Sequence, residues 1–427
     1  MVSFGEVLIG VTAFISLYTA LFFIITLLEN KNRITRPELK KNHPKNYPLV
    51  CIIVPCYNEE KTLGKTMESV LNLDYPSEKL DIIIVDDGSK DRTYQIASKY
   101  ASENRNVRVY KKKNAGKYTA LNLGLKKTKA EFVGALDADS FVHPKALKKI
   151  LVYFDNPGVM AVTPSLKVYK PNSWLQRIQM IEYSVGIFFR KMFALVGSIH
   201  VTPGPFSIYK KEFFEKHGHY TKAYMTEDIE VALRMQSHNY HIENAIDAYV
   251  YTVSPKNFKS LYYQRRRWYY GFMQNAIDYK HLFSKKHGNL GLYVLPLAFI
   301  SVLLVLTSFF YGLYKLGEGI WNSYQYARAV NFDIFHFDFP PDLFMINMNA
   351  SFILGIITII TGVLIIFLAI KAAKEKQKVV FSYIMYVIAY WVLFSFWWLV
   401  AVYYKFSGRT FSWNPKRKAQ DALSTGG

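Results

Sequence analysis

The sequence is poor in cysteine and in acidic side chains. Its 427 residues include only two cysteines, Cys51 and Cys56, whose spacing matches neither a zinc ligand pair nor a redox motif. We therefore expect reduced thiols, as in a cytosolic region. Asp and Glu number 32 against 53 Lys and Arg, which gives a formal net charge of +21. No recognisable nucleic-acid-binding module accompanies this charge, so we expect no nucleic-acid partner.

Long apolar runs, in contrast, are present. Hydrophobic residues make up 51% of the chain, more than a soluble core usually requires. Four runs reach the roughly 20 residues that a helix needs to cross the hydrocarbon core of a bilayer. They are residues 7–28, 292–314, 351–370 and 379–404. No basic region precedes the first run and no small-residue cleavage site follows it, which favours an uncleaved anchor over a signal peptide.

Basic residues near these spans predict their orientation, because Lys and Arg tend to stay on the cytoplasmic side. Lys31 and Arg33 follow the first span, and four lysines lie between the last two spans, whereas the loop at residues 317–349 is mainly acidic. We therefore expect an integral protein of the cell membrane whose middle region is cytoplasmic. The basic tail at residues 405–427 would then face outside, and its location is left open.

Apolar runs suited to strands alternate with helical segments between the first two spans. This pattern predicts an α/β domain. Ligands of such sheets bind beyond the carboxyl ends of the strands, so the polar residues after each run are the predicted site. The predicted strands are residues 49–55, 80–85, 107–110 and 131–136, and the predicted helices are residues 60–71, 93–100 and 119–127.

Acidic turns follow three of the predicted strands. They read YNEE at residues 57–60, DDGSKD at 86–91 and DADS at 137–140. In an extended segment Asp137 and Asp139 point to the same side, so the pair can face a diphosphate and hold one hard cation, Mg²⁺ or Mn²⁺. Each turn alone has the alternative of an ordinary capped or solvated turn. Three such turns after three strands favour a binding site.

A further acidic motif, TED at residues 226–228, precedes a helical pattern. Asp228 can serve as a general base, because a positioned carboxylate can take a proton from a reacting group. The alternative is a helix N-terminal acid stabilised by the helix dipole, with Thr226 as its cap. Glu227 can fill that structural position equally well, which favours a functional Asp228.

Two segments outside the spans are amphipathic. In the first, residues 174–199, apolar residues recur at helical spacing but Arg177, Glu182 and Lys191 interrupt any full span. We expect it to lie on the membrane surface, with a plain buried helix as the alternative. The second, residues 258–275, mixes Tyr and Trp with arginines, as at a headgroup boundary.

The motifs YNEE, VDDGSKD, DADS, TED and QRRRW, in this order, resemble those of the membrane-embedded processive enzymes of glycosyltransferase family 2. That group contains the cellulose, chitin, hyaluronan and poly-N-acetylglucosamine synthases. The resemblance covers about residues 49–271 and the flanking spans, and its most specific elements are TED and the QxxRW of residues 264–268. It implies a GT-A type nucleotide-sugar domain, a Rossmann-like mixed sheet inserted between transmembrane helices, with interfacial amphipathic helices.

The resemblance also implies a donor site. Asp87 would bind the uracil of the donor, and Tyr57 and Glu59 would line that pocket. Lys117, in the segment NAGKYTALN, would contact the donor nucleotide. Asp137 would approach the ribose and the diphosphate.

The remaining matching residues would hold the metal, the leaving group and the acceptor. Asp139 would ligate Mg²⁺ or Mn²⁺, and Asp228 would be the general base. Gln264, Arg267 and Trp268 match the QxxRW signature, with Arg267 near the diphosphate and Trp268 near the acceptor. Arg265 and Arg266 lie between Gln264 and Arg267, and we expect one of these two arginines to be solvated or to face lipid.

Two further features bear on the acceptor. The segment TPGPFSIYK at residues 202–210 corresponds to an acceptor-side loop, but Pro203 and Pro205 depart from the small-residue pattern expected there. Aromatic residues of the spans can stack on sugars in a passage, although membrane anchoring or helix packing is the more common use of such residues. The aromatic residues concerned are Trp391, Trp397, Trp398 and Tyr403.

The predicted function is inverting, metal-dependent transfer of a sugar from a UDP-linked donor to a growing polysaccharide at the cytosolic membrane face, with translocation through the protein's own helices left open. The alternatives are a non-processive enzyme that glycosylates a lipid or polyprenyl phosphate, and a transporter or catalytically silent scaffold.

The expected partners are the nucleotide sugar, a glycan or lipid acceptor and the bilayer, and homo-oligomerisation is left open. The predicted parts are a transmembrane helix at 1–30, the GT-A domain at 48–250, an interfacial segment at 251–290, three transmembrane helices at 291–404 and a basic tail at 405–427.

Overall fold

An eight-stranded mixed sheet forms the centre of the middle region in the computed structural model, which describes residues 3–32, 47–329, 350–375 and 380–408. Its strand order is β3-β2-β1-β4-β7-β6-β8-β5. The strands β1 to β4 run parallel, and the pairings of β7 with β4 and β6 are antiparallel. The predicted α/β mixed sheet is therefore confirmed. The strands are β1 (Val50–Cys56), β2 (Leu80–Asp86), β3 (Val107–Lys111), β4 (Phe132–Ala135), β5 (Ser140–Val142), β6 (Val159–Val168), β7 (Ile208–Lys210) and β8 (His241–Thr252).

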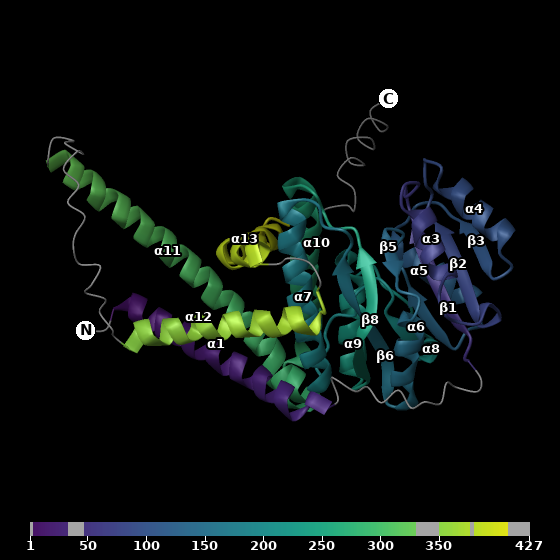
Figure 1. Cartoon of the computed structure of the whole chain (residues 1–427), viewed down its shortest axis with the longest axis horizontal. Helices are drawn as coiled ribbons and strands as arrows, with labels where there is room; N and C mark the ends of the chain where they lie inside the picture. Colours follow the sequence, from purple (N-terminus) through teal and green to yellow (C-terminus); the bar gives the residue numbers. More distant parts are fainter. Residues whose placement is uncertain (1–2, 33–46, 330–349, 376–379, 409–427) are drawn as a thin grey trace.

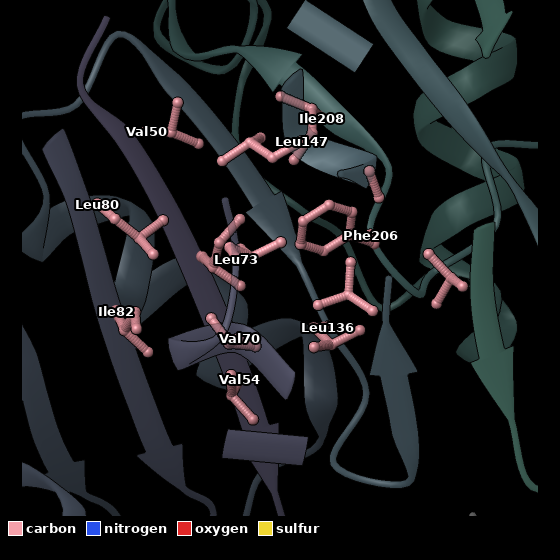
Figure 2. Packing of buried hydrophobic residues seen from close by; sticks show 14 of the residues in the cluster. Val50, Val54, Val70, Leu73, Leu80, Ile82, Leu136, Leu147, Phe206 and Ile208 are labelled. Carbon is pink, nitrogen blue, oxygen red and sulfur yellow. The ribbon is translucent and has the colours of Figure 1, made fainter. Parts of the chain in front are cut away.

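The continuous apolar run of β1 is explained by burial on both faces of the sheet. All seven residues of β1 are buried, as expected for a parallel strand covered by helices on each side. Figure 2 shows one of the two resulting cores, in which Val54, Val70 and Ile82 pack together. The covering helices in this half are α3 (Leu63–Leu71), α4 (Thr93–Glu103) and α5 (Lys117–Lys127).

The strand register brings the predicted acidic turns to one edge. Cys56 at the end of β1 pairs with Asp86 of β2, and Ile53 pairs with Ala135 at the end of β4. The turns that follow β1, β2 and β4 therefore leave the sheet at the same carboxyl edge, where α/β folds bind their ligands.

The second half of the region adds helices that connect the sheet to the apolar helices. Helix α7 packs on β6 and β8 with one side and on α12 and α13 with the other, so it lies between the sheet and the apolar helices (Figure 1). Twelve of its 22 residues are buried. This matches the alternative of a buried helix along most of its length, and Trp174 and Arg177 near its start are the exposed exceptions. The helices are α6 (Ala146–Leu151), α7 (Trp174–Leu195), α8 (Lys211–His217), α9 (Glu227–Ser237) and α10 (Phe258–Asp278).

Within the described parts of the chain, four helices are long and apolar enough to cross a membrane, at the positions of the four predicted spans. Many of their large apolar side chains are exposed, including Leu303 at 65% and Ile359 at 66%, as expected for lipid-facing surfaces of a membrane protein. Helix α1 packs against α12, and α11 packs against α13. Most of the acidic loop and the basic tail lie outside the described residues. The helices are α1 (Phe4–Glu29), α11 (Leu295–Ala329), α12 (Ala350–Ala372) and α13 (Val380–Phe406).

Candidate active site

A cavity of about 990 Å³ lies where the carboxyl edge of the sheet meets α7, α9 and α10. It is lined by the three residues of TED and by every residue to which the resemblance assigns a role in the site. These residues come from six separate segments of the chain, so their convergence is a product of the fold. They are Tyr57, Glu59, Asp87, Lys117, Asp137, Asp139, Thr226, Glu227, Asp228, Gln264, Arg267 and Trp268.

Asp87, the residue expected at the uracil, holds the loop before α5. Its Oδ1 accepts hydrogen bonds from the Lys112 ammonium (2.5 Å) and the Ala115 amide (3.1 Å), and its Oδ2 accepts one from the Gly116 amide (2.9 Å). Gly116 has a φ of 103°, which glycine adopts at little cost. The carboxylate thus orders the turn that delivers Lys117 into the cavity.

Lys117 stands at the centre of a charge cluster. Its ammonium lies 2.6 Å from Asp137 Oδ1 and 3.2 Å from Glu227 Oε1. Burial opposes the charge of the ammonium, but Asp137 and Glu227 outweigh this effect and hold the pKa of Lys117 above its ordinary value. A Cβ on Gly204 would come within 3.0 Å of the same ammonium, which explains a glycine at this point.

The segment with Asp137 and Asp139 is a turn and not the extended segment that the sequence predicted. Both carboxylates still line the cavity. Burial, followed by repulsion from Asp137 and Glu59, raises the pKa of Asp139 to about 7. Burial also raises the pKa of Glu59, whose Oε2 accepts a hydrogen bond from the Thr62 hydroxyl at 2.6 Å. The acidic turns therefore bring three carboxyl groups close together.

Asp228 lies in the first turn of α9, as both of its predicted interpretations require. Burial, and then the neighbouring Glu227, raises the pKa of Asp228 to about 6, while Lys117 and Arg267 act in the opposite direction. The expected capping bond from Thr226 is absent, since this side chain makes no cap hydrogen bond to α9 and donates to the carbonyl of Ala223 at 2.8 Å.

The backbone before TED is strained. Ala223, Tyr224 and Met225 have positive φ values of 36°, 54° and 65°, a region that costs a non-glycine residue about 1–3 kcal/mol. Helix α10 closes over this segment, because the Asn275 amide donates to Thr226 Oγ1 at 2.9 Å. Gly271 permits the approach, since a Cβ there would lie 2.3 Å from the same oxygen.

The basic run of α10 is buried, which corrects the expected solvated or lipid-facing position of Arg265 or Arg266. Arg265 is 3% exposed, forms an ion pair with Glu182 of α7 at 2.7 Å and places its guanidinium 4.3 Å from the Trp268 ring centre. Arg266 is 8% exposed and donates to the Tyr404 hydroxyl at 2.9 Å. Aromatic and acidic partners far along the chain account for the burial.

The loop at residues 202–210 borders the cavity through Pro203, Gly204 and Pro205. It is tied to the start of α9, because the Thr202 hydroxyl donates to the Asp228 carbonyl at 2.8 Å and accepts from the Tyr209 hydroxyl at 2.9 Å. The two prolines that depart from the expected pattern thus line the cavity in a loop that is hydrogen-bonded to the start of α9.

One of the four aromatic residues considered for a passage reaches the cavity. Trp398 of α13 lines it, whereas Trp397 is buried in a cluster with Leu175 and Leu261. Trp391 and Tyr403 are each 52% exposed, as expected for residues that face lipid. The cavity therefore extends from the sheet edge to a helix that can cross the membrane.

Sequence reasoning missed several residues of the cavity wall. Tyr183 and Arg190 lie seven residues apart on α7, a spacing that places them on one helical face. His200 also lines the cavity, and burial lowers its pKa. The polar interruption of the apolar pattern at Glu182 was the available signal, but it served only as evidence against a full membrane span, and Arg190 was not considered.

The mixed sheet, the acidic turns at its carboxyl edge and the carboxylate beside it define a GT-A type fold. A solved structure of this kind, a mannosyltransferase from Pyrobaculum calidifontis in complex with GDP-Man and Mn²⁺, is similar with a TM-score of 0.50 and 20% identity, over 75% of this chain and 95% of that one. Residues 51–218 match the family model of glycosyl transferase family 2. The middle region thus contains a family 2 glycosyltransferase domain.

The chain is also similar to poly-beta-1,6-N-acetyl-D-glucosamine synthases. It is 31% identical to the one of Staphylococcus epidermidis over 261 residues, which cover 60% of this chain and 63% of that protein. It is 33% identical to that of Staphylococcus aureus over 225 residues, or 52% of this chain and 54% of that protein. The matched region thus spans between about half and two thirds of these relatives.

Proposed function

We propose that this protein is an inverting synthase that transfers a sugar from a UDP-linked donor to a growing polysaccharide at the cytoplasmic face of the cell membrane. The observation that carries the proposal is the convergence of all twelve predicted site residues in one cavity. The similarity to poly-beta-1,6-N-acetyl-D-glucosamine synthases supports a polysaccharide product. The basic residues near the spans support a cytoplasmic active site.

In the proposed mechanism, the cations of the site stabilise the leaving group. Lys117 and Arg267 both line the cavity near Asp228, and their positive charges partly offset the rise in the pKa of Asp228 that burial causes. Positive groups in this position stabilise a departing nucleoside diphosphate, where negative charge develops as the sugar is transferred. Asp87 keeps the loop that carries Lys117 in place, and Tyr57 forms part of the wall beside it.

Asp228 is the proposed base. A pKa of about 6 leaves most of the carboxylate ionised at neutral pH, yet brings its basicity closer to that of the working pH than an exposed aspartate. It takes the proton from the acceptor hydroxyl as that oxygen attacks the anomeric carbon and the bond to the diphosphate breaks. Inversion needs no second catalytic carboxylate, which agrees with a partner role of Glu227 toward Lys117.

The acidic turns fit Mg²⁺ or Mn²⁺, with Asp139 as the proposed ligand and Asp137 beside it. Crowding with Asp137 and Glu59 raises the pKa of Asp139 to about 7, and a divalent cation would compensate these charges. Within the described parts of the chain, no group of three His, Cys, Asp or Glu side chains forms a metal site. Diphosphate oxygens and water would complete the oxygen shell. When bound, the cation would neutralise charge on the diphosphate.

A second candidate is a non-processive enzyme that glycosylates a lipid. The observation in its favour is that the cavity is lined by Trp398 of α13, a helix able to cross the membrane. The same contact is compatible with export of a glycan along α13. The length of the product separates these two candidates.

The test is nucleotide release by the detergent-purified protein with a panel of UDP and GDP sugars, with and without Mg²⁺ or Mn²⁺, followed by sizing of labelled product. We expect metal-dependent turnover of a UDP sugar and a long glycan. A single sugar on an extracted lipid would favour the second candidate. No release with any donor in native lipid would contradict the proposal.

A further inference from the structure

The cavity has an inner chamber between α7 and α10, beyond the predicted donor site. We use the name for the part bordered by Tyr183, Gly186 and Arg190 of α7, by Trp268 and Phe272 of α10, and by Trp398 of α13. Its walls are mainly aromatic, and Asp228 lies close enough to Arg190 to affect its pKa. The chamber is therefore adjacent to the proposed base.

Among the described residues, Arg190 makes no hydrogen bond or ion pair. Glu182 of the same helix is paired with Arg265 at 2.7 Å. Burial lowers the pKa of Arg190 to about 10, against smaller opposing effects of Tyr183 and Asp228. The guanidinium is thus charged at neutral pH and borders the cavity without a hydrogen-bond partner among the described residues, so a ligand that enters the chamber can supply one.

A second donor in the chamber is also unsatisfied. Trp398 is 6% exposed, and its indole Nε1 makes no hydrogen bond. Buried polar atoms in proteins are nearly always hydrogen-bonded, so an unpaired indole N–H on a residue that lines a cavity is unusual. Arg190 and Trp398, on different helices, thus border the same chamber and have no hydrogen-bond partner for these groups among the described residues.

The chemistry of arginine defines the matching group. A guanidinium carries five N–H donors and no acceptor, so it complements an oxygen that only accepts, such as an amide carbonyl or a phosphate, better than a hydroxyl. We infer that Arg190 binds an oxygen of this kind on the acceptor and thereby selects which acceptor is glycosylated. This inference rests on the proposed function, because it assigns a residue to the acceptor side of that reaction.

The first experiment compares Arg190→Gln with Arg177→Gln, an exposed arginine of the same helix that does not line the cavity. The acceptors are an N-acetylated oligosaccharide, its de-N-acetylated counterpart and a polyprenyl phosphate. Calorimetric binding of the nucleotide sugar serves as the control for folding. We expect Arg190→Gln to lower kcat/KM about tenfold or more for an acceptor with the matching oxygen, with an effect below about threefold on the counterpart without it.

The acceptor that loses rate identifies the source of the oxygen. Loss with the N-acetylated oligosaccharide alone assigns the amide carbonyl, and loss with the polyprenyl phosphate alone assigns the phosphate. An equal loss with all acceptors, no loss, or weakened donor binding would overturn the inference. Arg190→Lys keeps the positive charge but loses the paired N–H donors of the planar guanidinium. We therefore expect its rate to lie between those of Arg190→Gln and the unaltered protein.

Gly186 offers an independent test by steric filling. Gly186 lines the chamber, and a Cβ there meets no atom within 4 Å, so the backbone has room for a side chain at this position. We expect Gly186→Phe to abolish transfer while nucleotide-sugar binding persists, and Gly186→Ala to have a much smaller effect. Full transfer by Gly186→Phe would show that the acceptor does not enter the chamber.

The controls separate this inference from the proposed function. If the unaltered protein transfers no sugar from any donor to any acceptor, the proposed function fails. If it transfers sugar and Arg190→Gln keeps the same acceptor preference, only the assignment of Arg190 fails.

Discussion

At the scale of single residues, the environment of Asp228 keeps its carboxylate ionised at neutral pH and also raises its basicity. Its place in the first turn of α9 favours negative charge through the helix dipole. Burial and Glu227 act against that charge and raise its pKa to about 6. The result is a carboxylate that is ionised at neutral pH but more basic than an exposed aspartate.

This environment predicts the pH dependence of the reaction. Because a base must be deprotonated, kcat/KM should be constant above about pH 7 and fall about tenfold per pH unit below pH 6. Protonation removes activity here, so the loss occurs on the acid side. The measurement is nucleotide release against pH with saturating metal.

Asp228→Asn tests the same assignment. We expect transfer to fall by about 100-fold or more, since general bases contribute rate factors of about 10²–10⁴. Donor binding should persist, because the donor contacts come from other segments. A variant with near-normal rate, or with the pH profile of the unaltered protein, would exclude Asp228 as the base.

At the scale of elements, the ion pair between Arg265 and Glu182 joins α10 to α7. The hydroxyl of Tyr390 on α13 also donates to Glu182, at 3.1 Å. Three helices thus share one carboxylate, and Arg265 in turn lies 4.3 Å from the ring centre of Trp268. The pair therefore positions Trp268, which lines the cavity.

Removal of Glu182 from its ion pair with Arg265 should destabilise the folded protein. We expect Glu182→Leu to lower the free energy of unfolding by about 3 kcal/mol, because it leaves a buried guanidinium without a counter-charge. Thermal unfolding in detergent measures the effect. Glu103→Gln, which breaks the exposed pair with Lys99 on α4, should cause no measurable change. If Glu182→Leu and Glu103→Gln behave alike, the ion pair does not hold the helices together.

The contact between α10 and TED supports a second prediction at this scale. Gly271→Ala should force α10 away from Thr226 and lower stability by about 1–3 kcal/mol, with a loss of transfer. Gly312→Ala is the matched control, because a Cβ there meets no atom within 4 Å. Equal unfolding temperatures for the two variants would contradict the close approach.

At the scale of the whole molecule, the sheet and its site edge were predictable because they depend on local pattern. The apolar runs of β1 and β2 indicated buried parallel strands, and the turns after them had to meet at one edge. The burial of Arg265 was not predictable, because its partner Glu182 lies 83 residues earlier and no local pattern specifies such a pairing. The turn at Asp137 and the orphan Arg190 likewise depend on tertiary surroundings.

Helix α10 contacts α9, which carries Asp228, and also α13, which can cross the membrane. A bilayer whose hydrocarbon thickness does not match a spanning helix changes the tilt of that helix. A change in the tilt of α13 would therefore shift α10 relative to the base. We expect the rate of transfer in nanodiscs to pass through a maximum as the acyl chains are lengthened, with little change in nucleotide-sugar binding. The thickness of the bilayer would then control the rate of sugar transfer at a site outside the hydrocarbon core.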